Sequence, residues 1–107
     1  MRDREGCTLA ESAWLRVVAD SPESEWSPPS LYNLAVCREF DQEWPQALAY
    51  YERLLNDYPG DPLIKDARFR RGLVLEELGE YRQAKRAFRA LKRDARPLKL
   101  SPADYLA

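Results

Sequence analysis

The residues that could do chemistry in this chain are two cysteines, a few carboxylates and many basic side chains. Cys7 and Cys37 occur in a chain without any histidine. Two cysteines alone cannot complete a four-ligand zinc site, and a cysteine nucleophile would lack its usual general base. The simplest interpretation is two free thiols packed as small apolar groups, and a disulfide is the alternative in an oxidising compartment.

Other catalytic arrangements are also missing from the sequence. Glu76, Glu77 and Glu80 lie together near an expected helix end, where an exposed helical face explains them. The chain has four glycines and none are clustered, so it has no glycine-rich phosphate loop. We therefore expect no catalytic residue, no metal site and no cofactor, and we predict that the protein is not an enzyme.

Basic residues recur every three or four positions near the carboxyl end and so share one helix face. This basic stripe consists of Arg82, Lys85, Arg86, Arg89, Lys92, Arg93 and Arg96, followed by Lys99. A solvated convex surface explains it most simply. The functional alternative is an acidic partner, such as an anionic membrane or the acidic half of a second copy. The formal net charge of −1 and the absence of aromatic residues among the cations on this face argue against nucleic acid.

The charge is unevenly distributed along the chain. Residues 1–60 hold 5 Lys and Arg against 11 Asp and Glu, whereas residues 61–107 hold 12 against 7. The chain is therefore electrically dipolar.

A repeat with a period of 37 residues must position these side chains. Its copies are Ala10-Trp14-Val17, Ala47-Tyr51-Leu54 and Ala84-Phe88-Leu91. A small residue, an aromatic four positions later and an aliphatic three further lie on one helix face. Pro22 and Pro59 follow the first two copies at the same spacing and end the helix. Each unit therefore predicts a helix that buries this stripe of small, aromatic and aliphatic residues and is followed by a turn.

Prolines and glycines between these units determine where the expected helices begin and end. We predict helices over about 8–20, 29–41, 45–57, 62–78 and 81–95, with the start of another at 101–107. Prolines stand near the starts of several segments, and Gly79 suits the position after a helix. No segment alternates with period two for long, so no strand is expected.

This pattern resembles the tetratricopeptide repeat family, in the longer-looped variety frequent in bacterial envelope proteins. Residues 65–97 carry the resemblance through Gly72, Leu75, Gly79, Tyr81, Ala84, Phe88 and Leu91, and residues 28–59 through Leu31, Leu34, Ala35, Trp44, Ala47, Tyr51 and Leu54. Residues 8–22 resemble half of an earlier repeat. Arg38, Arg68 and Arg71 depart from the family pattern, since they replace large apolar or aromatic residues. The resemblance implies a single all-α domain over 1–107, an α-solenoid of antiparallel helical hairpins.

The family geometry also implies a concave groove lined by the first helix of each repeat, which binds peptides or partner helices. Its expected lining is Tyr32, Asn33, Val36 and Phe40 from one repeat, and Phe69, Arg70, Leu73, Glu76 and Glu77 from the next. Val36, Phe69 and Leu73 are alternatively plain core.

We therefore predict a scaffold for protein–protein interaction, with electrostatic binding of an acidic partner, nucleic acid or anionic membrane through residues 82–99 as the alternative. Open solenoid ends predict some self-association. No apolar run is long enough to span a membrane, and no signal peptide is evident. The cytoplasm is slightly favoured, and the periplasm stays open if the chain is a fragment.

Overall fold

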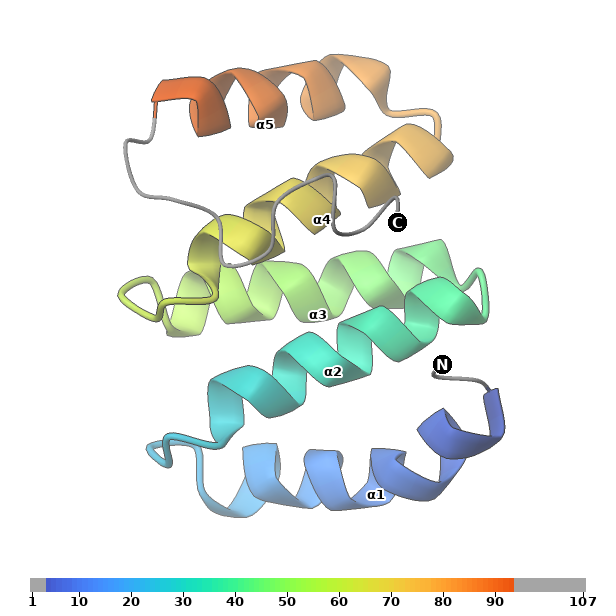
Figure 1. Ribbon diagram of the computed structural model, residues 1–107, viewed down its shortest axis with the longest axis vertical. Coiled ribbons are helices and arrows are strands. Elements are labelled where there is room, and N and C mark those ends of the chain that lie inside the picture. The colour runs from blue at the N-terminus through green and yellow to red at the C-terminus, as the bar shows by residue number, and fades with distance from the viewer. Residues whose placement is uncertain (1–3, 94–107) are drawn as a thin grey trace.

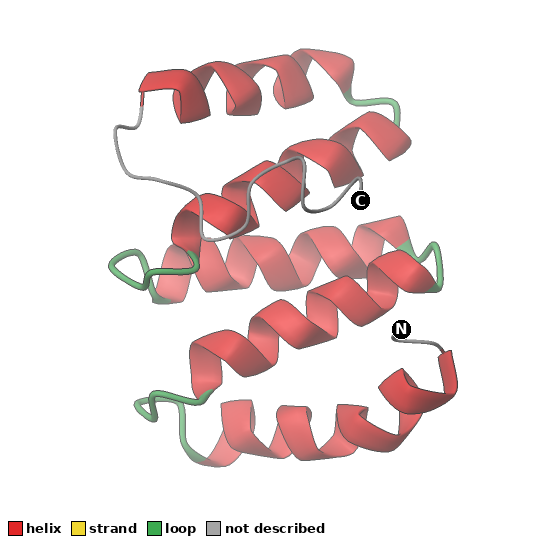
Figure 2. Cartoon of the chain, in the orientation of Figure 1, coloured by secondary structure: helices red, strands yellow, loops and turns green. Residues whose placement is uncertain are grey.

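The computed structural model describes residues 4–93, and within that range helices alternate with short loops and no strand occurs (Figure 2). The helices are α1 (Arg4–Asp20), α2 (Ser27–Phe40), α3 (Trp44–Asp57), α4 (Ile64–Glu77) and α5 (Tyr81–Arg93). The all-α prediction is confirmed. The largest boundary difference is that α1 begins at Arg4 rather than near residue 8. The further helix expected at 101–107 lies outside the described residues.

The helices stack in chain order, each packed against its neighbours in sequence (Figure 1). Short connections force consecutive helices to run antiparallel, so each pair forms a hairpin. Because contacts are made chiefly between neighbours along the chain, the architecture is that of a helical repeat solenoid.

Prolines and left-handed residues define the hairpin turns. Proline stands in the first turn of both α2 and α3, where its missing N–H costs nothing. After α4, Gly79 has a φ of 81°. The N–H of Gly79 donates to the carbonyl of Glu76, and the N–H of Glu80 donates to that of Leu75. This pair of bonds satisfies carbonyls at the end of the helix.

The middle copy of the repeated stripe lies in the core. Ala47, Tyr51 and Leu54 are fully buried on α3, and they pack with leucines of α2 and with Ile64 of α4. Small residues permit close approach between helices: a Cβ added to Gly72 of α4 would lie 2.6 Å from Cε1 of Phe88 on α5. The core is therefore continuous across the repeat boundary.

Cys7 of α1 and Cys37 of α2 form a disulfide, with their Cα atoms 5.6 Å apart. The interpretation of the two cysteines as free thiols is therefore wrong. Both side chains are buried where α1 packs on α2, and the Cα separation lies within the range that a disulfide requires.

Two of the three arginines that depart from the family pattern are accommodated by carboxylates. Arg38 lies among three of them, at 3.2 Å from Glu11, 3.4 Å from Asp41 and 2.6 Å from Glu43. Arg71 donates twice to Glu52 of α3, at 3.1 and 3.2 Å. At Arg38 and Arg71 the basic side chain is thus matched by ion pairs with a neighbouring helix or across a turn.

Candidate functional site

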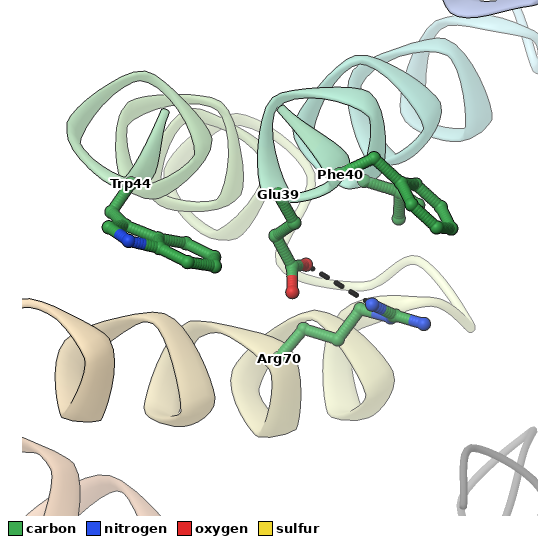
Figure 3. A pocket seen from close by; sticks show the side chains of 5 residues that line it. Glu39, Phe40, Trp44 and Arg70 are labelled. Carbon is green, nitrogen blue, oxygen red and sulfur yellow. Dashed lines mark hydrogen bonds and ion pairs between the residues drawn. The ribbon is translucent and has the colours of Figure 1, made fainter. Parts of the chain in front are cut away.

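A hollow of about 200 Å³ opens between the end of α2, the start of α3 and the middle of α4. It is lined by Val36, Glu39, Phe40, Trp44 and Arg70 (Figure 3). Two helices of one repeat and the first helix of the next therefore contribute to the same site.

The local structure explains why these side chains meet. Val36, Glu39 and Phe40 are spaced by three and four residues, so they share one face of α2. Gln42 then takes the left-handed conformation, with a φ of 58°, and the reversed chain brings Trp44 beside the end of α2. Figure 3 shows Glu39 pointing towards Arg70, with Trp44 and Phe40 on either side.

A polar network fixes the base of the hollow. Nη1 of Arg70 lies 3.2 Å from Oε2 of Glu39, and Nε of Arg70 donates to the hydroxyl of Tyr32 at 2.9 Å. The hydroxyl of Tyr51 donates to the same Oε2 of Glu39. The rings of Tyr32 and Tyr51 meet edge to face with centroids 6.1 Å apart, and the Arg70 guanidinium lies 5.9 Å from the Tyr32 centroid. Residues of α2, α3 and α4 are thereby linked into one unit.

Burial shifts the pKa of two groups in this network. Loss of solvent raises the pKa of Glu39, although the hydrogen bond from Tyr51 and the charge of Arg70 act in the opposite direction. Burial and the negative charge of Glu39 raise the pKa of Tyr51 well above its ordinary value of 10.0. Tyr51 therefore stays a neutral donor to Glu39 at neutral pH.

The walls of the hollow are mainly apolar, and one of them is open to solvent. Phe40 is 54% exposed, whereas Trp44 is half-buried and Val36 is buried. A large aromatic side chain in water beside a concave apolar surface is typical of a binding site, since such patches mark interaction sites.

The nine residues expected to line the groove are only partly brought together. Val36, Phe40 and Arg70 line the hollow, and Tyr32 is joined to it through Arg70. The hollow does not include Asn33, Phe69, Leu73, Glu76 or Glu77. Phe69 instead packs against Phe88, with ring centroids 6.0 Å apart. Val36 is part of the core and also lines the hollow.

Sequence reasoning missed Glu39 and Trp44 as site residues. Glu39 follows Val36 by three positions, which places both on one helix face, and that spacing could have identified it. The sequence pattern marks Trp44 only as a repeated large residue. It predicts a turn between the helices that end and start near residues 41 and 45, but not the left-handed conformation of Gln42 on which the place of Trp44 depends.

The basic stripe is exposed on α5. Its described members are Arg82, Lys85, Arg86, Arg89, Lys92 and Arg93, and all are exposed. None of these six makes an ion pair with another described residue, and α5 carries no acidic side chain. Arg96 and Lys99 lie outside the described residues.

Two further properties concern the described part of the chain alone. None of its helices is both long and apolar enough to cross a membrane. It also contains no group of three or more His, Cys, Asp or Glu side chains placed to hold a metal ion.

Comparison with known proteins identifies the fold. The profile of the family described as tetratricopeptide repeat matches residues 30–61 and 66–95, more than half of the chain. No curated protein and no solved structure gave a match. Repeats of this family generally mediate protein–protein interaction, and their proteins are typically non-enzymatic scaffolds. The repeated stripe, the stacked hairpins and this match together place the chain in the tetratricopeptide repeat family.

Proposed function

We propose that the protein is a non-enzymatic scaffold that binds a peptide or partner helix by taking one of its side chains into the hollow between α2 and α4. The observation that carries this proposal is Phe40. It is 54% exposed at the rim of an apolar hollow, although the fold buries other large side chains completely. A partner that covers Phe40 would remove apolar surface from water.

The size of the hollow favours a side chain over a small-molecule ligand. Its volume of about 200 Å³ is below the range of roughly 300–1,000 Å³ typical of small-molecule sites. The peptide backbone would then run along the surface beside α2 and α4, with one anchoring residue inserted.

The network at the base makes the hollow suited to binding. Glu39, Arg70, Tyr32 and Tyr51 hold one another through hydrogen bonds from three helices. Little side-chain freedom is left to lose when a partner docks, and a preorganised site binds more tightly for that reason.

A peptide library displayed on phage tests the proposal. Peptides selected on the wild-type protein should lose most of their affinity for Phe40→Ala. They should retain it for Tyr81→Ala, the matched control, because Tyr81 is also an exposed aromatic residue but lies on α5 away from the hollow. Selected peptides that bind both variants equally well would show that the hollow is not the binding site.

A second candidate function rests on the six basic side chains of α5, none of which pairs with another described residue. These side chains favour an acidic partner. Binding of vesicles containing anionic lipid, or of a single-stranded oligonucleotide, should then weaken steeply as salt rises. The double variant Arg86→Gln/Arg89→Gln should reduce the binding, and Phe40→Ala should not. If neither probe binds at low salt, this candidate is rejected for membranes and nucleic acid.

A further inference from the structure

We propose that the hollow selects an aromatic side chain that carries a hydrogen-bond donor at its tip, which means a tyrosine or tryptophan of the partner. This inference rests on the proposed function and specifies the chemistry of the anchoring residue.

One oxygen of Glu39 has no partner within the described part of the protein. Arg70 and Tyr51 both donate to Oε2, and no described group donates to Oε1. The side chain is only 15% exposed, so water reaches this oxygen from a limited direction. A docked side chain that excluded this water without offering a donor would leave the acceptor unsatisfied, which is costly. The anchoring residue is therefore expected to bring an N–H or O–H group.

The walls require that the rest of the anchoring side chain be apolar. Phe40 and Trp44 stand on either side of Glu39 (Figure 3), and Val36 completes the apolar part of the lining. Aromatic rings pack favourably against other rings in edge-to-face or offset arrangements. A phenol or an indole offers such a ring and also ends in a donor.

A cationic side chain fits the hollow less well. Arg70 already neutralises Glu39 at 3.2 Å, so an ammonium or second guanidinium would place unbalanced positive charge in a partly buried site. The protein itself shows the preferred chemistry, because Tyr51 presents a neutral hydroxyl to the same carboxylate. A partner tyrosine or tryptophan would do the same for the other oxygen.

Titration of single amino-acid derivatives into the ¹⁵N-labelled protein tests this preference. The probes are the N-acetyl amides of tyrosine, tryptophan, phenylalanine and lysine, and the signals are the Phe40 amide and the Trp44 indole N–H. One neutral hydrogen bond predicts that the tyrosine and tryptophan probes bind roughly 3- to 10-fold more tightly than the phenylalanine probe.

Glu39→Gln is the variant that tests the role of the free oxygen. Arg70 and Tyr51 both donate, so they should hold the amide oxygen of the new side chain and turn its NH₂ group towards the hollow. An indole N–H would then meet a donor, and the preference for tryptophan over phenylalanine should disappear. Glu52→Gln is the matched control, because Glu52 also pairs with an arginine but does not line the hollow.

Each other outcome overturns the inference. Equal binding of the phenylalanine and tryptophan probes to the wild-type protein would remove the donor requirement, and tighter binding of lysine would reverse the charge argument. If no probe moves the two signals while library peptides still depend on Phe40, this inference fails and the proposed function stands. If the library peptides instead bind Phe40→Ala as tightly as the wild-type protein, the proposed function itself fails.

Discussion

Gln42 and Gly79 stand 37 residues apart and both take the left-handed backbone conformation just after a helix, with φ values of 58° and 81°. Their hydrogen bonds also correspond. The N–H of Gln42 donates to the carbonyl of Glu39, and the N–H of Glu43 donates to the carbonyl of Arg38. One repeat later, the N–H groups of Gly79 and Glu80 make the two equivalent hydrogen bonds. Gln42 carries a Cβ atom, so its left-handed conformation in the turn that brings Trp44 to the hollow has a steric cost that Gly79 does not have.

Replacing Gln42 with glycine should stabilise the protein. Glycine adopts positive φ without a Cβ clash, so Gln42→Gly is expected to raise the free energy of unfolding by about 1 kcal/mol. Urea denaturation measures the change. Gly79→Ala is the converse control and should destabilise, since nothing lies within 4 Å of the added Cβ and only the backbone strain differs. A lower stability for Gln42→Gly would contradict this account of the turn.

Loss of the disulfide should weaken the attachment of α1. The two cysteines are separated by 30 positions in the sequence, and closing a loop of that length is worth about 3–4 kcal/mol in the chain-entropy description. Cys7→Ser/Cys37→Ser should lower the unfolding free energy by up to that amount. Disulfides persist in oxidising compartments, so wild-type protein recovered from a reducing cytoplasm should show two free thiols on alkylation and the stability of the variant. Equal stability of the oxidised and reduced forms would contradict this.

Gly72 tests how closely α4 and α5 must approach. In Gly72→Ala the new methyl group would lie 2.6 Å from Cε1 and 2.8 Å from Cζ of Phe88, and Phe88 is itself packed against Phe69. We expect a loss of about 1–3 kcal/mol, the usual cost of overpacking, in thermal or urea unfolding. Gly60→Ala is the matched control, because nothing lies within 4 Å of its added Cβ. A neutral effect of Gly72→Ala would show that Phe88 can move aside.

The outer side of α1 is the surface on which self-association is expected. Leu9 is 77% exposed and Leu15 is 41% exposed, and α1 packs chiefly against α2. Sedimentation at rising protein concentration should show weak association that Leu9→Ser/Leu15→Ser reduces. A wild-type protein that stays monomeric at high concentration would exclude this surface as an interface.

The fold followed from the sequence because the repeated stripe has a direct physical meaning. Ala47, Tyr51 and Leu54 were expected to share one buried face and are fully buried. The corresponding Phe88 is only half-buried, because α5 ends the described stack and is covered mainly by α4. Period and residue size therefore predicted the core well wherever a helix has neighbours on both sides.

The candidate site was less predictable, because it depends on geometry between elements. Glu39 is a charged residue near a helix end, which on its own indicates solvated surface. Only the packing of α2 against α3 and α4 brings Tyr51 and Arg70 to it. The pairing of Cys7 with Cys37 likewise depends on how α1 lies against α2, and spacing along the chain does not fix that.

Alkaline pH should destabilise the protein through Tyr51. Burial and the charge of Glu39 raise the pKa of Tyr51 above the ordinary 10.0, so above about pH 10 the unfolded chain has released this proton while the folded protein still holds it. The folded state then binds more protons, and the free energy of unfolding must fall as pH rises, by at most about 1.4 kcal/mol per pH unit for one group.

Tyr51→Phe should be less stable at pH 7, since Glu39 loses a donor, but its stability should fall less steeply above pH 10. Urea unfolding at several pH values measures these slopes, and identical slopes for Tyr51→Phe and the wild type would mean that the hydroxyl of Tyr51 is not buried beside Glu39 in the folded protein.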